Sequence, residues 1–336
     1  MQLANQLKFH VRRIPWFKKA LKKALRIRAV NDQIASLERK LIYQYIASLN
    51  QRVEALEGKS VLKALDFGTW PTPSFAKPVS QAVTCEQMLS PEYAEWCDRL
   101  HIEPNFHRKS WEYLYILRAL EQAGKLRPGM KGVGFGVGKD PIVAYMVKQG
   151  CDLIATDLDP ASAHEKGWAQ SNQYSEKLLN LNEYGVCSDR ALKKHVALRN
   201  VNMNEIPGEL RKGQFDFTWS ACAYEHLGSI ENGIQFVLNS LECLKPGGIA
   251  VHTTEFNISS NEETLTFGGT VLFRQKDFVE MGERVRKAGG KMELNFNLGT
   301  QPMDRFYDVP PYSEFNHLRL QLDQYLTTSF GVIITK

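Results

Sequence analysis

One stretch of the chain restricts the fold more than any other, the glycine-rich segment at residues 130–141. It reads MKGVGFGVGKDP, a short apolar run that enters a loop with glycine at every second position. An apolar helical segment continues to Gly150, and a second apolar run, CDLIATD, ends at Asp157. Strand, glycine loop, helix and strand make a βαβ unit, which predicts an α/β fold with parallel strands. We expect Asp140 to cap the helix after the loop and Pro141 to occupy its first turn.

The spacing of the loop indicates a cofactor that contains adenosine. Glycines let the backbone approach a ligand closely, and a carboxylate at the end of the second strand accepts hydrogen bonds from ribose hydroxyls. The pattern is Gly-x-Gly-x-Gly, not the Gly-x-Gly-x-x-Gly of dinucleotide folds. It is not a phosphate loop either, because Lys139 is followed by an aspartate. The predicted cofactor contacts here are Gly134, Gly136, Gly138 and Asp157.

Four ordered blocks of sequence resemble the class I S-adenosylmethionine (SAM)-dependent methyltransferases. They are GFGVG, TDLDP, RNVNMNEIP at 199–207, and FDFTWSACAYEHLG at 215–228 followed by LKPGGIAVHTTEF. The resemblance implies SAM as the cofactor, with Asn202 near the adenine and Ser220 of the fourth strand as a further contact. It covers residues 106–336, and it implies a Rossmann-like, seven-stranded, mostly parallel sheet. Its last strand is expected to be antiparallel.

The chain departs from the family pattern at one position. Members of the family carry an acid two residues before the first glycine of the loop, where it helps to orient the methionine end of the cofactor. Gly132 stands there in this chain. Arg108, Lys109 and Trp111, from the preceding helical segment, are the candidates to take over that end.

The catalytic residues are expected beyond the fourth and fifth strands, because ligands of open α/β sheets bind at the carboxyl ends of the strands. Glu225 and His226 follow the fourth strand, and His252 and Glu255 lie at the end of the fifth. We expect these four residues to converge on one rim. His226 or His252 would act as general base, and Glu225 or Glu255 would orient it. The opposing interpretation is that His226 packs beneath the cofactor and Glu225 caps the next helix.

The Glu-His pair also resembles that of the ubiquinone-biosynthesis O-methyltransferases. In those enzymes, acidic residues and a histidine near this loop hold a divalent metal. The resemblance implies Mg²⁺ as a second cofactor, held by Glu225 or Glu255. The match is partial, because the position of an upstream acid in that pattern is occupied here by Cys222. The identity of any metal stays open.

The segment 302–320, PMDRFYDVPPYSEFNHLRL, lies between the last two predicted strands and mixes charged, aromatic and proline residues. In this fold such an insertion often lines the acceptor pocket. The catalytic stretch resembles a bacterial group of methyltransferases associated with surface-polysaccharide biosynthesis, which implies O-methylation of a saccharide or glycan. The alternatives are a small-molecule or lipid methyltransferase and a non-catalytic SAM-binding scaffold. Gly132 is the only support for the scaffold.

The N-terminal part of the chain carries an uneven share of the charge. The protein has 42 Lys+Arg and 37 Asp+Glu, a formal net charge of +5. Residues 1–31 contain basic residues and no acid, so the remainder is net acidic. Apolar residues recur there at helical spacing around Pro15, which predicts two short basic amphipathic helices. They suit an anionic membrane surface, or they pack on the body or on a second chain. Nucleic acid is the least favoured partner.

The organisation upstream of the methyltransferase region is predicted in two further pieces. Residues 32–60 carry about two heptads of apolar residues, typical of a helix that forms a short coiled coil in a homodimer or docks on the body. Residues 61–105 are expected to form a linker and a helical segment. The six scattered cysteines predict free thiols and a cytoplasmic protein, peripheral to the membrane if the basic helices bind it.

Overall fold

The computed structural model describes residues 62–159, 178–312 and 316–336 of the 336-residue chain. The predicted basic helices at 1–31 and the predicted heptad helix at 32–60 lie outside the described residues, so their proposed contacts stay predictions. Within the described part, no helix is long and apolar enough to cross a membrane. All six cysteines are free thiols, as the sequence predicts.

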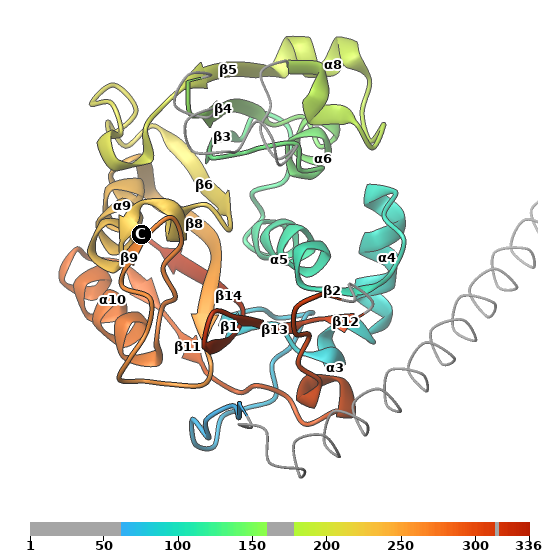
Figure 1. Ribbon diagram of the computed structural model, residues 1–336. Helices are drawn as coiled ribbons and strands as arrows, with labels where there is room; N and C mark the ends of the chain where they lie inside the picture. The colour runs from blue at the N-terminus through green and yellow to red at the C-terminus, as the bar shows by residue number, and fades with distance from the viewer. Residues whose placement is uncertain (1–61, 160–177, 313–315) are drawn as a thin grey trace, which may run out of the picture. The chain divides into compact units, whose positions relative to one another are not determined.

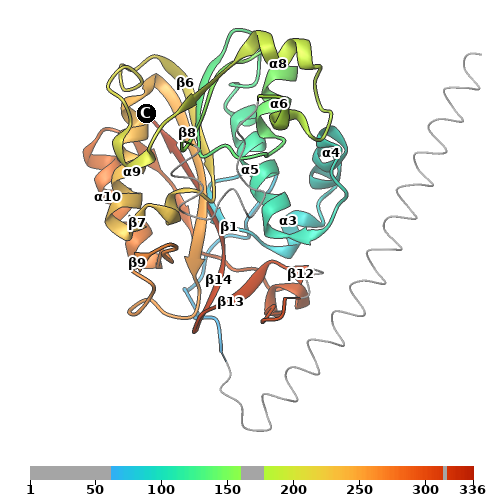
Figure 2. The ribbon, with the colours of Figure 1, turned by 45° about the horizontal axis from the view of Figure 1, so that its top comes forward.

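In the described part of the chain, a large sheet carries helices on both faces (Figures 1 and 2). In both views α9 (Ile230–Glu242) and α10 (Gln275–Lys287) lie on one face, and α5 (Arg108–Gln122) and α6 (Ile142–Lys148) lie on the other. This arrangement confirms the predicted Rossmann-like α/β class. The central strands β6, β8 and β14 are buried on both faces, polar residues included, so their sequences show no alternation of apolar and polar residues.

The sheet has ten strands. Its main path runs through β5 (Val196–Asn200), β4 (Asp152–Asp157), β3 (Lys131–Phe135), β6 (Phe215–Ala221), β8 (Leu244–Asn257), β14 (Tyr325–Thr335), β1 (Ser80–Ala82) and β11 (Leu294–Asn295). From β5 to β8 every neighbouring pair is parallel, and β14 is antiparallel to β8. The antiparallel last strand is therefore confirmed.

The strand number is ten rather than the predicted seven because short strands cover the outer edge of β14. β10 (Lys291–Met292), β1 and β13 (Arg319–Leu322) pair in turn with its C-terminal, middle and N-terminal parts. A long exposed strand edge invites pairing with another chain, so these additions protect it. β1 comes from the segment 61–105, which was predicted to hold only a linker and helices.

The remaining elements lie outside the main sheet. They are α3 (Cys85–Met88), α4 (Pro91–Leu100), β2 (Phe106–His107), η1 (Leu178–Asn182), α8 (Asp189–His195), η2 (Met203–Glu205), η3 (Tyr224–His226), β7 (Gly228–Ser229), β9 (Phe267–Gly268), η4 (Pro302–Arg305) and β12 (Asn316–His317). Two small ladders connect distant segments: β2 pairs with β12, and β7 pairs with β9. The second ladder begins two residues after η3, the short helix that contains the predicted catalytic pair Glu225 and His226.

Helix α5 connects the fold to the site, because its first turn lies over the ends of the central strands. The His107 side chain accepts a hydrogen bond from the backbone N–H of Lys109 and caps the helix. At the other end Gly124 has a φ of 67°, and the N–H groups of Gly124 and Lys125 bond to the carbonyls of Glu121 and Leu120. This is the glycine-terminated helix end that the sequence predicts.

Candidate active site

A cavity of about 330 Å³ lies where β3, β4, β5 and β6 end. Ligands of proteins bind in concave sites of this kind. The walls of the cavity come from the loops after these strands and from the first turns of α5. The lining residues are Lys109, Tyr113, Gly136, Gly138, Lys139, Asp140, Asp157, Leu158, Glu183, Tyr184, Val201, Asn202, Met203, Ala221, Cys222, Ala223, His226 and Leu227. The position at the carboxyl ends of the strands is the one that the sequence predicts.

Two of the three predicted glycines face this cavity. Gly136 and Gly138 line it with φ angles of 59° and 51°, a left-handed conformation that other residues rarely adopt. Gly134 serves packing within the sheet instead, because a Cβ there would lie 2.2 Å from Cζ2 of Trp219. Gly134 is therefore a position where only glycine fits, without being among the lining residues.

Asp157 lies where the ribose of an adenosine cofactor is expected. Its carboxylate accepts hydrogen bonds from the backbone N–H groups of Gly138, at 3.1 Å, and Leu158, at 2.9 Å. Burial raises the pKa of Asp157 to about 6, while these two hydrogen bonds oppose the shift. The residue thus ties the glycine loop to β4 and offers its remaining lone pairs to the cavity.

Asn202 lines the opposite part of the cavity, after β5. Its side-chain oxygen accepts from the backbone N–H of Asn204 at 3.0 Å and caps η2. The amide NH₂ of Asn202 remains as a donor group, which suits the acceptor nitrogens of an adenine. Leu158 and Met203, which the sequence analysis did not single out, add apolar surface beside it. The fit of these residues to SAM supports the predicted cofactor.

His252 does not lie on the rim, which corrects the sequence prediction. It is fully buried in β8, where Ser220 Oγ lies 2.8 Å from Nδ1 and Ser240 Oγ lies 3.1 Å from Nε2. The Ser240 hydroxyl donates to the carbonyl of Val237, so it accepts from Nε2–H and Nδ1 accepts from Ser220. Burial lowers the pKa of His252 to about 3.

The predictions for His252 as a catalytic residue and for Ser220 as a cofactor contact therefore both change. His252 is a neutral core residue with both ring nitrogens occupied by buried hydroxyls, and Ser220 is its partner rather than a cavity residue. The reason is strand length: β8 continues to Asn257, paired with β14, so His252 lies in the middle of the strand. Ser220 pairs with it directly across the β6–β8 ladder.

His226 is the histidine that the structure places at the cavity. Its Nδ1 lies 2.7 Å from the backbone carbonyl of Gly269, a distance that requires a proton on Nδ1. Nε2 therefore carries the lone pair of the neutral ring. Glu225 Oε1 lies 3.9 Å from Nε2. This arrangement agrees with the predicted Glu-His pair and gives it a definite tautomer.

Glu225 itself is buried under the site. Its Oε2 accepts from the Thr254 hydroxyl at 3.1 Å. Burial raises the pKa of Glu225, and the nearby Glu255 adds to the shift, whereas His226 opposes it. At 3.9 Å from Nε2, this carboxyl group acts on the imidazole through electrostatics and not through a direct hydrogen bond.

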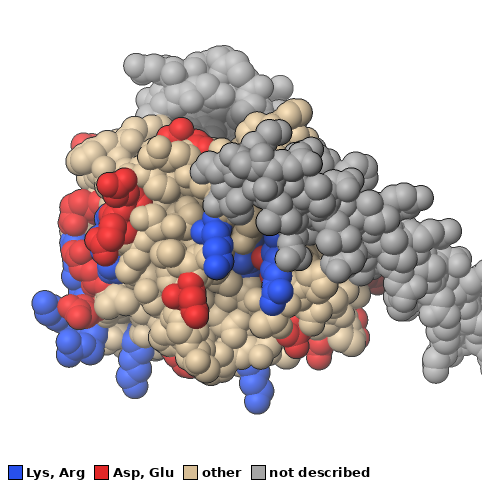
Figure 3. All heavy atoms as spheres, turned by 60° about the horizontal axis from the view of Figure 1, so that its bottom comes forward, with Lys and Arg blue, Asp and Glu red and all other residues tan. Residues whose placement is uncertain are grey.

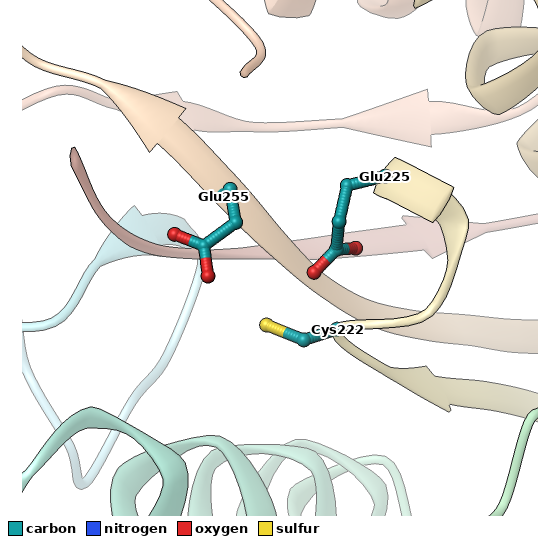
Figure 4. A group of neighbouring side chains, drawn as sticks. All are labelled: Cys222, Glu225 and Glu255. Atoms are coloured by element: carbon teal, nitrogen blue, oxygen red, sulfur yellow. The ribbon is translucent and has the colours of Figure 1, made fainter. Parts of the chain in front are cut away.

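Cys222, Glu225 and Glu255 form a compact group beneath the cavity (Figure 4). Cys222 comes from the turn after β6, Glu225 from η3 and Glu255 from β8. The three side chains point toward one another, and their ligand atoms lie within 4.8 Å of one another. Cys222 has a φ of 43°, an uncommon value for a residue other than glycine. Burial raises the pKa of the Cys222 thiol well above its usual range, and Glu112 and Glu225 add to that shift.

This group does not fit Mg²⁺. Magnesium prefers oxygen ligands, and a protonated thiol is a poor ligand for it. The cationic charge is already supplied by the protein, because Arg108 forms an ion pair with Glu255 and Lys109 lies 3.1 Å from Glu112. Burial alone would raise the pKa of Glu112, but Lys109 and Arg108 hold it below its usual range. The group is a buried network of ion pairs and hydrogen bonds.

The insertion at 302–320 reaches this network from the other side. Exposed Tyr312 packs edge-on against His317, which stacks on His107 at a centroid distance of 4.8 Å. Asp308 Oδ2 lies 2.7 Å from Nδ1 of His317. Tyr312, His317 and His107 thus form a row of aromatic rings, the aromatic row. His107 caps α5 next to Arg108, so this row ends at the charged first turn of that helix.

Of the three residues proposed for the methionine end, one lines the cavity. Lys109 does so, whereas Trp111 is buried and donates to Gln87 at 2.9 Å, and Arg108 is held by Glu255. Asp140 does not cap α6, because Pro141 holds the cap position without a side-chain hydrogen bond. Asp140 lines the cavity instead, a role that the local pattern did not reveal.

Comparison with protein families gives one match. Residues 133–252 match a family described as "Methyltransferase domain". This segment runs from β3 to β8 and contains the glycine loop, Asp157, Asn202 and the Glu-His pair. A comparison with curated proteins gives no match.

Part of this chain is similar to several solved structures of low sequence identity. A SAM-dependent methyltransferase from Aquifex aeolicus is 17% identical over 66% of this chain and 88% of its own, with a TM-score of 0.34. A SAM-dependent methyltransferase from Mesorhizobium loti is 16% identical over 65% and 96%, with a TM-score of 0.39. TehB from Haemophilus influenzae is 14% identical over 65% and 60%, with a TM-score of 0.39.

Proposed function

We propose that this chain, whose residues 133–252 match a methyltransferase domain, transfers a methyl group from SAM to a hydroxyl group of a saccharide or glycan. The observation that carries the proposal is the orientation of His226. The carbonyl of Gly269 holds the Nδ1 proton, so Nε2, 3.9 Å from buried Glu225, is the basic nitrogen of a histidine that lines the cavity.

The reaction requires that the protein align the acceptor and remove its hydroxyl proton. SAM supplies an electrophilic methyl group, so the site must align an acceptor oxygen with it and remove the hydroxyl proton. The acceptor oxygen forms its bond to the methyl carbon as the bond from that carbon to sulfur breaks. The hydroxyl proton passes to Nε2 of His226, and the buried carboxyl of Glu225 stabilises the imidazolium. S-adenosylhomocysteine (SAH) and the methyl ether are the products.

A sugar-like acceptor is supported by the aromatic row beside the site. Tyr312 offers an exposed aromatic face with a polar hydroxyl, and His317 and His107 continue it toward Arg108. Such mixed apolar and polar surfaces suit a ring with many hydroxyl groups. Burial raises the pKa of Tyr312, Asp308 and Glu255 add to the shift, and Arg108 opposes it.

The charge distribution on the face shown in Figure 3 gives no support to a nucleic-acid partner. On the face shown in Figure 3, Lys and Arg side chains are interspersed with Asp and Glu, and uncharged residues cover most of the described surface. A nucleic-acid interface needs a broad basic patch or stripe. The described residues of this face do not form one.

The test is methyl transfer with purified full-length protein, SAM and glycans isolated from bacterial surfaces, followed by mass spectrometry. A product heavier by one methylene group per acceptor is expected. His226→Ala should lower turnover by about 100-fold or more, with SAH affinity changed by less than about threefold. His195→Ala, at the end of α8, is the matched control and should retain full activity.

Three outcomes would count against the proposal. Full turnover by His226→Ala would exclude it as the base. Transfer only to small molecules or lipids would exclude the glycan acceptor. Binding of SAH without transfer to any acceptor would favour the SAM-binding scaffold.

A further inference from the structure

The methionine end of the cofactor lacks the acid that the family pattern expects, and the sheet leaves no room to restore it. A Cβ at Gly132 would lie 2.2 Å from Cε2 of Phe217. The amino-acid end of SAM is a zwitterion, with one ammonium and one carboxylate. Other groups must therefore compensate both charges if SAM binds in this cavity.

Three acids line the cavity in the described part of the chain, and two of them already have a defined role. Asp157 accepts from two backbone N–H groups at the ribose position. Glu183 lies 3.5 Å from Lys139 at the surface. Asp140 is the third: it is half-buried beside Tyr113 in the cavity wall and does not cap α6, and burial raises the pKa of its carboxyl group to about 7 while Tyr113 opposes that shift.

A cation faces the same part of the cavity from α5. Lys109 lines the cavity one turn of the helix before Tyr113, the residue beside Asp140. Its ammonium group bonds to Glu112 at 3.1 Å, and a lysine ammonium has three N–H donors, so it can hold a second carboxylate. Both residues line the cavity, and the positive charge of Lys109 lowers the pKa of Asp140, which favours the charged carboxylate there.

We propose that Asp140 and Lys109 together bind the amino-acid end of SAM, Asp140 its ammonium and Lys109 its carboxylate. Tyr113 acts as a positioning residue that holds the Asp140 carboxylate toward the cavity. The acid that the family carries on the first strand is thereby moved to the turn before α6. This assignment rests on the proposed SAM-dependent function.

Three related ligands separate the two roles. SAH carries both charges of the amino-acid end, decarboxylated SAH carries only the ammonium, and methylthioadenosine carries neither. Calorimetry of the full-length protein measures the affinity for each. Because charge-assisted hydrogen bonds are at stake, each lost partner should weaken binding by about tenfold or more.

Asp140→Asn should weaken SAH and decarboxylated SAH by about tenfold or more and change methylthioadenosine by less than about threefold. Lys109→Met should weaken SAH alone. Asp98→Asn, an exposed position of α4, is the matched control and should change none of the affinities. Binding of methylthioadenosine also shows that each variant is folded.

The proposal is overturned if Asp140→Asn binds SAH as the unchanged protein does, or if it loses all three ligands equally. The same holds for Lys109→Met if the loss is as large for decarboxylated SAH as for SAH. Failure of the unchanged protein to bind SAM or SAH would be a different result. It would refute the methyltransferase function itself.

Discussion

His252 gives the sharpest test of the distinction between core and catalytic residues. The structure assigns it to the core: the ring is fully buried and bonds to Ser220 and Ser240. We expect His252→Gln to retain methyl transfer from SAM, because no reacting group touches this side chain. The stronger consequence concerns how stability depends on pH.

The sign follows from proton linkage. In the unfolded chain a histidine has a pKa of about 6.5, whereas burial lowers the pKa of His252 to about 3 in the folded protein. The imidazole of residue 252 therefore binds a proton in the unfolded state but not in the folded state. The free energy of unfolding falls as the pH drops from about 6.5 toward 3. Above pH 7 this residue contributes no pH dependence.

The magnitude at pH 5 depends almost entirely on the unfolded chain. Protonation of an unfolded histidine with a pKa of about 6.5 stabilises the unfolded state by about 2 kcal/mol at pH 5. The folded state stays unprotonated there even if its pKa were one unit higher. For a domain of this size, this corresponds to a lowering of the melting temperature by about 4 °C.

The assay compares melting temperatures of the unchanged protein and His252→Gln at pH 8.0 and pH 5.0. The variant lacks the linked proton, so its melting temperature should fall by about 4 °C less between the two values. All other titrating groups are shared by the two proteins and cancel in the difference. Equal pH dependence in both would refute the assignment, as would a loss of turnover in His252→Gln with unchanged SAH affinity.

Three further predictions concern the cavity. Gly134→Ala should cost about 1–3 kcal/mol of stability because its Cβ would overlap Trp219, whereas Gly208→Ala, with open space around it, should cost far less; equal unfolding curves in urea would contradict this packing role. Asp157→Asn should weaken SAH binding by about tenfold or more in calorimetry, and unchanged affinity would contradict the ribose assignment. Burial raises the pKa of Asp140 to about 7 and that of Asp157 to about 6, and a bound ligand needs both carboxylates, so SAH affinity should rise from pH 5.5 to 7.5. Binding should release protons, which calorimetry in buffers of different ionisation enthalpy measures. An affinity that does not change with pH would refute this prediction.

Local sequence patterns predicted the parts of the fold that local physics determines. The glycine loop and Asp157 were found because a backbone that approaches a ligand closely demands glycine, and Gly136 and Gly138 do adopt left-handed angles. The end of α5 at Gly124 follows from the same steric rule. The ten-stranded sheet could not be predicted in this way, because β1 and β13 are too short to show a period of their own.

The site was predicted less completely, since its residues depend on tertiary pairing. A strand buried on both faces shows no alternation, so nothing in VHTTEFN marks where the strand ends. The position of that end decides which polar residues of β8 lie in the core and which lie near the cavity. Pairing with β14 extends β8 to Asn257, which places His252 in the core and brings Glu255 to the ion pair with Arg108.

The same reasoning explains why Asp140 was assigned to the wrong role. Aspartate followed by proline before an apolar run is a typical helix start, and no local feature distinguishes a capping carboxylate from one that faces a ligand. The role of the Asp140 carboxylate depends on α5, which is distant in sequence and whose residues Lys109 and Tyr113 line the same cavity. Under the proposal for Asp140, the acid that is absent from the first strand is replaced by one in the neighbouring turn. In a cofactor site the charge at a given place in the cavity therefore matters more than its position in the motif.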